Sequence, residues 1–130
     1  MGPVNWLAVF LAAALALAIG MVWNGPFFRT GRQLLPGKSE RMGKFILVGL
    51  LFLVSSAMLG HNFARIGTET LHAKPWLYLM QTGGIAIAFV IPAVWLSHLR
   101  NRTEPMNRVV DCIFWLIAYI AMGVVFWALG

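Results

Sequence analysis

The sequence predicts an all-α protein, a four-helix transmembrane bundle with short loops. Of its 130 residues, 60% are hydrophobic and only 11% are charged, and the mean hydropathy is +0.79. A soluble domain carries roughly 25% charged residues, so this chain has too few polar side chains to cover a globule in water. Its apolar residues also gather in four runs of about 20 residues each, the length of helix that crosses a ~30 Å hydrocarbon core.

The four expected spans lie in a single integral membrane domain and are separated by linkers that hold prolines, glycines and charges. They cover residues 4–24, 44–63, 76–98 and 109–129 of the chain 1–130. No Lys or Arg precedes the first run, so the charged region of a signal peptide is missing and we expect this run to be kept as a span. In the third span, Pro92 removes the hydrogen bond to the Ala88 carbonyl, which predicts a proline kink.

Basic residues predict the orientation of the bundle. The first linker holds five Lys or Arg residues and the third holds three, whereas the second holds only Arg65 and Lys74. With four spans, the first and third linkers share a side, so the split is eight against two. The positive-inside rule then places those two linkers in the cytoplasm and both termini on the outer side of the membrane. It also explains the net charge of +6 by topology, so we expect no nucleic-acid partner.

Tryptophans fall near the ends of the expected spans, where indole rings favour the headgroup region. Trp115 lies somewhat deeper, and the five expected interface anchors are Trp6, Trp23, Trp76, Trp95 and Trp127. The stretch after Trp23, Asn24-Gly25-Pro26, is expected to end the first helix.

Small residues predict close helix packing, because helices in lipid associate through backbone approach rather than through hydrophobicity. The first span carries a ladder at i, i+4 spacing, and two later spans carry shorter pairs. The expected packing positions are Ala8, Ala12, Ala16, Gly20, Ser56, Gly60, Gly84 and Ala88. The partner of the ladder is either another helix of this chain or another protein.

Few polar side chains interrupt the spans. They are Ser55, Ser56, Gln81, Thr82 and Asp111. We interpret the uncharged four as hydrogen-bonding groups between helices, each contact contributing ~0.6 kcal/mol; the alternative is a polar path for a substrate. Asp111 lies one turn after Arg108, which favours an ion pair between them over a proton relay.

The histidines are weak candidates for ligands, and the single cysteine, Cys112, is expected to be a buried structural thiol. His61 and His98 are expected at opposite faces of the membrane, about 30 Å apart, so they cannot hold one haem or one metal ion. His72 shares a side with His61, but only Glu69 accompanies them, whereas zinc sites use three or four ligands. We therefore predict no cofactor and no metal, while contact with a partner's pigment or haem stays open.

The stretch VNWLAVFLAAALALAIGMVWNGPFF (4–28) resembles the opening of a family of small bacterial membrane proteins known only as a domain of unknown function. The matching residues are Asn5, Trp6, Gly20, Trp23 and Pro26, and Asn24 stands where a Tyr is usual. The stretch Ala121-Met122-Gly123 is also similar. The resemblance implies a four-span bundle in a bacterial inner membrane and implies no activity.

No catalytic motif appears, so the sequence favours a non-catalytic protein. We predict an accessory or scaffold subunit that packs against a larger respiratory or photosynthetic complex, since polar residues are sparse and loops are short. The alternative is a small homo-oligomeric transporter or channel, for which Ser55, Ser56, Gln81 and Thr82 would have to form the pore. A membrane enzyme or cofactor carrier lacks the residues it would need.

Overall fold

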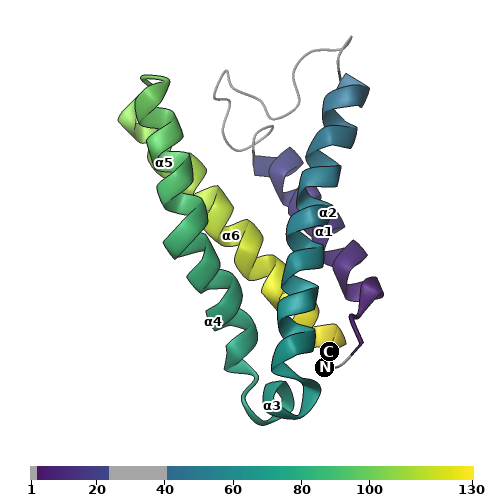
Figure 1. Cartoon of the computed structure of the whole chain (residues 1–130). Coiled ribbons are helices and arrows are strands. Elements are labelled where there is room, and N and C mark those ends of the chain that lie inside the picture. Colours follow the sequence, from purple (N-terminus) through teal and green to yellow (C-terminus); the bar gives the residue numbers. More distant parts are fainter. Residues whose placement is uncertain (1–2, 24–40) are drawn as a thin grey trace.

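The computed structural model describes residues 3–23 and 41–130 as helices joined by short turns (Figure 1). The elements are α1 (Trp6–Val22), α2 (Arg41–Ile66), α3 (Thr68–Ala73), α4 (Trp76–Ile85), the π-helical turn η2 (Ala86–Val90), α5 (Ile91–Arg100) and α6 (Pro105–Leu129). The described part of the chain holds no strand, which confirms the all-α class. Residues 24–40, which include the expected helix end at Asn24-Gly25-Pro26 and three of the five basic residues of the first linker, lie outside the described residues.

Three of the helical segments are long and apolar enough to cross a membrane: Phe45–Ile66, Trp76–Arg100 and Pro105–Leu129. The fourth, Trp6–Val22, has 17 residues, which corresponds to about 25 Å at ~1.5 Å per residue. It is therefore shorter than the expected span 4–24. The last helix begins four residues before the expected 109, because Pro105 occupies its first turn, where a missing N–H costs nothing.

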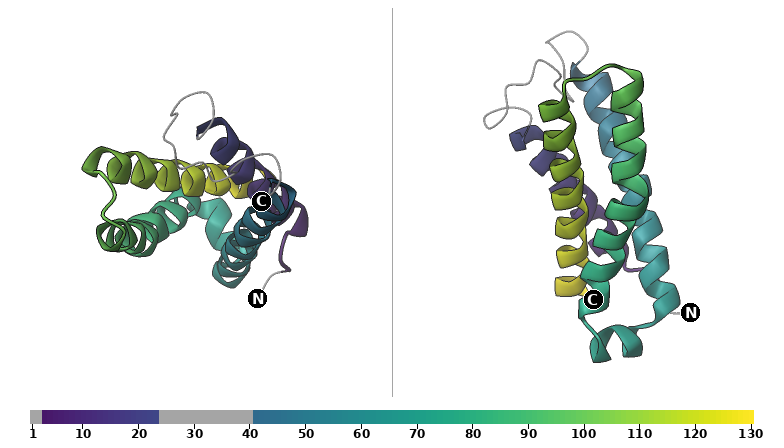
Figure 2. Two further views of the ribbon diagram at one scale, coloured as in Figure 1. Left: turned by 90° about the horizontal axis from the view of Figure 1, so that it is seen from above. Right: turned by 90° about the vertical axis from the view of Figure 1, so that its left-hand side faces the viewer.

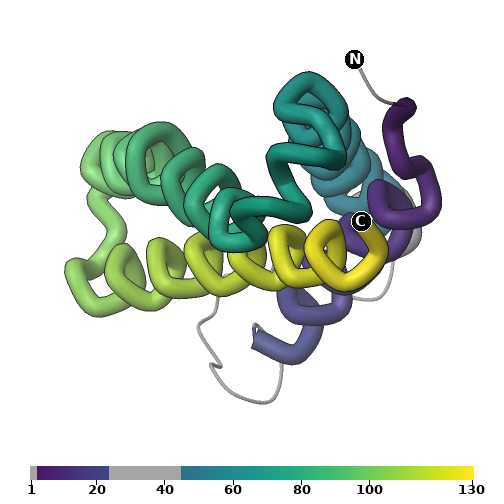
Figure 3. Tube along the Cα trace, turned by 90° about the horizontal axis from the view of Figure 1, so that it is seen from below, coloured from purple at the N-terminus to yellow at the C-terminus, as the bar shows by residue number. Residues whose placement is uncertain are grey.

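Helix α6 lies at the centre of the fold. It packs against α1 on one side and against α4, η2 and α5 on the other, while α1 also packs against α2. Seen from above, α1 and the continuous α4–α5 segment flank α6 (Figure 2). The view from below shows the same order, with α2 beside α1 (Figure 3). The bundle is thus two helical hairpins that meet along α6.

The helix ends divide between two ends of the bundle (Figure 1). The end of α1, the start of α2 and the α5–α6 turn lie at one end, which we call the loop end. Both termini and α3 lie at the other, which we call the terminal end. Two hydrogen bonds tie the terminal end together: Asn5 Nδ2 donates to the Leu129 carbonyl at 3.0 Å, and His72 Nε2 lies 3.0 Å from the Gly130 carbonyl.

The ladder of the first helix is buried inside the chain. Ala8, Ala12 and Ala16 are fully enclosed, and Gly20 is also buried. Since α1 contacts α2 and α6, its partner helices belong to this chain. The small side chains let the backbones approach closely, as expected for helices whose association depends on fit.

Two glycines allow close contacts between these helices. A Cβ at Gly60 would lie 2.8 Å from Val9 Cγ2, and one at Gly123 would overlap Thr82 Oγ1 and lie 3.1 Å from Thr82 Cγ2. One turn before Gly60, Ser56 Oγ donates to the Val9 carbonyl at 2.8 Å. The α1–α2 and α4–α6 contacts therefore both rest on residues with little or no side chain.

The Gly84–Ala88 pair differs from the other small-residue pairs because it packs against nothing in the described chain. Both residues are exposed, and a Cβ at Gly84 would meet no atom within 4 Å. The buried face of α4 is formed instead by Tyr78, Thr82 and Gly83. The i, i+4 spacing alone could not tell which face of the helix points toward α6.

The third span contains the π-helical turn η2, which ends two residues before Pro92, and the proline kink stays a prediction. The Ile91 N–H donates to the Ala86 carbonyl, one residue further back than in an α-helix. A proline has no N–H to donate, so the α-helical hydrogen bond from residue 92 cannot form. The wider π-helical turn lies directly before this gap in the hydrogen-bond pattern.

Candidate functional site

The α5–α6 turn at the loop end builds a polar cluster between the third and fourth spans. After Arg100 the chain makes a short turn in which Arg102 adopts φ 53°, a left-handed conformation that is uncommon for residues other than Gly. The Thr103 N–H then donates to the His98 carbonyl at 3.0 Å. Because the turn is only four residues long, the end of α5 and the first turns of α6 come side by side.

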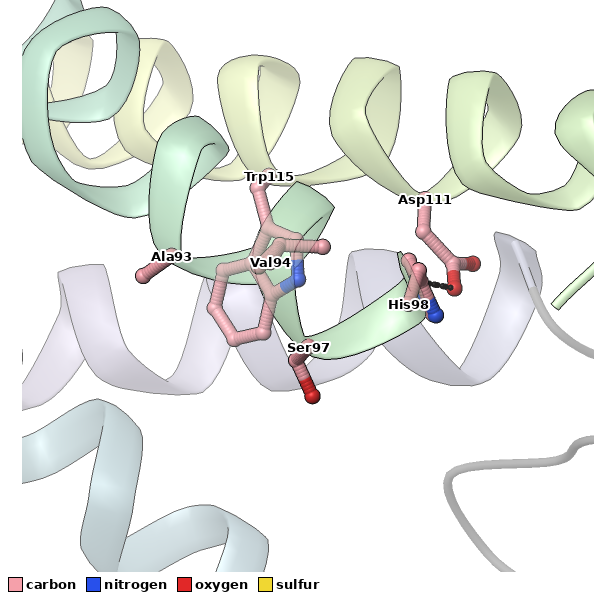
Figure 4. A pocket seen from close by; sticks show the side chains of 6 residues that line it. All are labelled: Ala93, Val94, Ser97, His98, Asp111 and Trp115. Atoms are coloured by element: carbon pink, nitrogen blue, oxygen red, sulfur yellow. Dashed lines mark ion pairs between the residues drawn. The ribbon is translucent and has the colours of Figure 1, made fainter. Parts of the chain in front are cut away.

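His98 is held on both sides of its ring. Its Nδ1 lies 3.1 Å from Thr103 Oγ1, and its Nε2 lies 2.7 Å from Asp111 Oδ2 (Figure 4). The side chains are 14% and 32% exposed, respectively, so the ion pair is largely shielded from solvent. The pair joins α5 to α6 one turn inside the bundle.

The expected partner of Asp111 was Arg108, and the structure corrects this. Arg108 Nε donates to the Thr103 carbonyl at 2.7 Å, and the guanidinium carbon lies 5.8 Å from the centre of the Trp95 ring. The i, i+3 spacing of Arg108 and Asp111 permits a pair on one helix, but the turn places an acceptor and an aromatic ring nearer to the arginine. Both charged residues of α6 therefore bind back onto the preceding helix and turn.

A cleft of about 340 Å³ opens beside this cluster. It is lined by Ala93, Val94, Ser97, His98, Asp111 and Trp115 (Figure 4). Trp115 also packs against Phe52 of α2, with ring centres 5.6 Å apart. The cleft thus has an apolar part between the helices and a polar part at the loop end.

The chemistry available in the cleft is that of an anchored ion pair. Thr103 Oγ1 and Asp111 Oδ2 lie beside the two ring nitrogens of His98, so each nitrogen already faces a partner within the chain. Cys112 follows Asp111 but is buried. The arrangement can fix the α5–α6 hairpin and close the loop end of the bundle.

The structure separates the two histidine candidates. His98 lies at the loop end, whereas His61 lies near the terminal end of α2, where its Nδ1 is 3.1 Å from the Ala57 carbonyl and its ring meets Trp6 edge-on. Across residues 3–23 and 41–130, no three His, Cys, Asp or Glu side chains are grouped so that they could hold a metal ion.

The other polar residues of the spans are divided among separate contacts. Ser56 and Thr82 are buried, and Thr82 Oγ1 donates back to the Tyr78 carbonyl of its own helix at 3.0 Å. Ser55 and Gln81 are half-buried. The structure therefore does not bring the four expected uncharged residues together into one polar path.

The expected interface tryptophans separate into two groups. Trp6, Trp76 and Trp127 belong to the terminal end and are 53%, 56% and 53% exposed. Trp23 and Trp95 belong to the loop end and are half-buried. Exposed indoles at the helix ends fit a belt at the membrane surface.

Sequence reasoning missed Thr103 and the contacts of Asn5. Thr103 is only 2% exposed, although its position in a charged linker suggests a solvent-facing residue. Asn5 caps α1, since its Oδ1 accepts from the Ala8 N–H at 3.1 Å while its Nδ2 reaches Leu129. An Asn directly before an apolar run is a recognisable cap signal, whereas nothing local marks Thr103.

A family model described as "Protein of unknown function (DUF1761)" matches residues 7–127, nearly the whole chain. The chain belongs to the DUF1761 family. The match confirms the resemblance to an uncharacterised family. No curated protein and no solved structure matches. Membership of DUF1761 therefore carries no activity with it, and the function of this DUF1761 chain is argued below from its own residues.

Proposed function

We propose that the protein is a non-catalytic accessory or scaffold subunit that packs against a larger complex in a bacterial inner membrane. Several polar groups of the described spans support this role because they already bind within the chain. Ser56 binds Val9, Thr82 binds Tyr78, and His98 binds Asp111. In lipid, the Ser56 and His98 contacts hold two helices together, whereas the Thr82 contact lies within α4. None of the three places a nucleophile beside a base.

The observation that carries the proposal is an exposed face of small residues on the third span. Its small residues are Gly84 and Ala88, which lie between Met80 and Pro92 at four-residue spacing, and all four are exposed. A Cβ at Gly84 would meet open space, whereas Ala8, Ala12, Ala16, Gly60 and Gly123 are buried in contacts between helices of this chain. Small side chains on a lipid-facing helix allow another helix to come close, so this face suits a membrane partner.

The orientation in this proposal follows the basic residues. Arg100, Arg102 and Arg108 belong to the loop end, where α1 ends and α2 begins, and in this proposal that end faces the cytoplasm. Both termini then face the periplasm. Any haem or pigment belongs to the partner complex and contacts this chain only by association.

A small homo-oligomeric transporter or channel is the second candidate. The feature that favours it is the π-helical turn η2 inside the continuous third span, because such turns recur at functional sites. In that case copies of the chain would meet along the same exposed face.

Gentle detergent extraction from the native host, followed by native electrophoresis, tests both candidates. The accessory role predicts that the chain migrates in a large assembly with proteins of other sequences. The absorption spectrum of that assembly reports any haem or pigment. A colourless assembly of this chain alone would reject the accessory role and favour the transporter.

A further inference from the structure

A second cleft lies toward the terminal end of the bundle, whereas the His98 cluster lies at the loop end. It measures about 350 Å³ and is lined by Asn62, Arg65 and Ile66 of α2 and by Gln81 of α4. Its lining is mostly polar, although α2 and α4 are both apolar helices that qualify as membrane spans. Polar side chains between two apolar helices need hydrogen-bond partners, so this cleft is a candidate binding site.

The lining residues come together because of their register. Asn62, Arg65 and Ile66 are spaced i, i+3, i+4 and so share one face of α2, which is turned toward α4 because Gln81 lines the same cleft. Gln81 follows Trp76 by five residues, or about 7.5 Å along the helix. Trp76 is 56% exposed at the start of α4, a position typical of the headgroup level. The cleft therefore extends from the headgroup level into the span.

The three polar side chains have hydrogen-bonding capacity to spare. Among the described residues, Asn62, Arg65 and Gln81 have no side-chain partner, and Arg65 contributes a permanent positive charge. The acidic residue on the adjoining helix, Glu69 of α3, is exposed and does not line the cleft. Arg65 is exposed, so its guanidinium is open to a ligand at the membrane surface, whereas Asn62 and Gln81 are half-buried. Half-buried amides without a partner are unfavourable, and together with the guanidinium they match an anion that carries further acceptor oxygens.

The surface of α2 between the cleft and the middle of the span is apolar. Met58 precedes Asn62 by one turn and is 62% exposed, and Val54, one turn further along α2, is 69% exposed. An apolar track thus continues from the polar cleft toward the middle of the span. This sequence of charge, amide groups and apolar surface corresponds in order to the phosphate, ester carbonyls and acyl chain of a phospholipid.

We propose that this cleft binds the headgroup of an anionic membrane phospholipid. The phosphate binds Arg65, and the ester carbonyls accept hydrogen bonds from the amide groups of Asn62 and Gln81. An acyl chain lies along Met58 and Val54. A soluble phosphate ester shares the headgroup chemistry, but it would use neither the depth of Gln81 nor the apolar track.

Native mass spectrometry of the full chain tests this site. The delipidated protein is mixed with equal amounts of phosphatidylglycerol and phosphatidylcholine, and the ratio of the two bound lipids is measured. The wild type should prefer phosphatidylglycerol. Arg65→Gln should weaken that preference by about fivefold, the contribution of one arginine at an anionic surface. Gln81→Leu should weaken the binding of both lipids.

Lys74→Gln is the matched control. Lys74 and Arg65 are the two basic residues of the second linker, and Lys74 is exposed but does not line the cleft. It should keep the wild-type preference. Equal losses in Arg65→Gln and Lys74→Gln would overturn the site in favour of general attraction. Displacement of the lipid by millimolar glycerol phosphate would assign the cleft to a soluble anion and overturn the lipid assignment. Circular dichroism checks that the variants are folded.

Discussion

His98 Nε2 and Asp111 Oδ2 lie 2.7 Å apart and join α5 to α6 across the shortest turn between two spans. The same imidazole contacts Thr103 Oγ1 through its other nitrogen. The turn, the last helix and the third span are therefore fixed to one another by a single histidine. This relationship closes the loop end of the bundle and leads to the first prediction.

Asp111→Asn should destabilise the protein by about 1–2 kcal/mol, between the values for exposed and for buried ion pairs. Thermal or detergent-induced unfolding measures the loss. His98→Gln should cost a similar amount, and the double variant should cost less than the sum, because both changes break one contact. Glu104→Gln is the control, since Glu104 is exposed in the same turn. Additive losses would show that the pair does not couple the two helices.

The buried ladder of α1 predicts a steric penalty inside the isolated protein. Ala12→Leu or Ala16→Leu places three extra carbons in a seam without free space, and overpacking of this kind costs ~1–3 kcal/mol. Leu15 is 38% exposed, so Leu15→Ile should be tolerated. Unfolding of the purified chain measures the effect. Wild-type stability of both alanine variants would contradict a tight α1 seam.

Glycines on two faces of the bundle should respond oppositely to the same substitution. Gly123→Ala places a Cβ against Thr82 and should lower stability by ~1–3 kcal/mol. Gly84→Ala meets open space and should raise the stability of the isolated chain by about 0.5–1 kcal/mol through helix propensity. Thr82→Ala should partly rescue Gly123→Ala. Destabilisation by Gly84→Ala in the purified monomer would mean that this face packs within the chain.

Single-cysteine labelling in intact cells checks the orientation, with Cys112 replaced by Ala. Thr68 and Glu104 are both exposed, and they belong to opposite ends of the bundle. A membrane-impermeant reagent added from outside the inner membrane should label Thr68→Cys and leave Glu104→Cys unlabelled until the cells are opened. Thr103 is unsuitable as a probe because it is buried. The reverse labelling pattern would place the termini in the cytoplasm.

The helical class and three long spans follow from hydropathy, because lipid requires every backbone group of a span to bond within its helix. The six-residue helix α3 was missed because its sequence, TETLHA, has no apolar period. The partner of Asp111 was also missed. Spacing along one helix identifies Arg108 as a neighbour, but only the rotation of α5 against α6 brings His98 to the carboxylate.

The small-residue positions show the same limit. Spacing identified Ala8, Ala12 and Ala16 as one face, and that face is buried. The same spacing identified Gly84 and Ala88, which are exposed. A repeat of small residues indicates that a helix can be approached closely, but the arrangement of the other helices decides whether the chain itself approaches. The exposure of Gly84 and Ala88 could therefore be learned only from the structure.

Site-specific photo-crosslinking in the native membrane tests the proposed accessory role most directly. A benzophenone amino acid replaces Ala88 on the exposed small-residue face, and the same group at Val54, which is 69% exposed on α2, serves as the control. We predict that position 88 yields a covalent adduct with one membrane protein of different sequence, and that position 54 yields none. An adduct at position 88 that contains only two copies of this chain, or the absence of any protein adduct there, would contradict the accessory role.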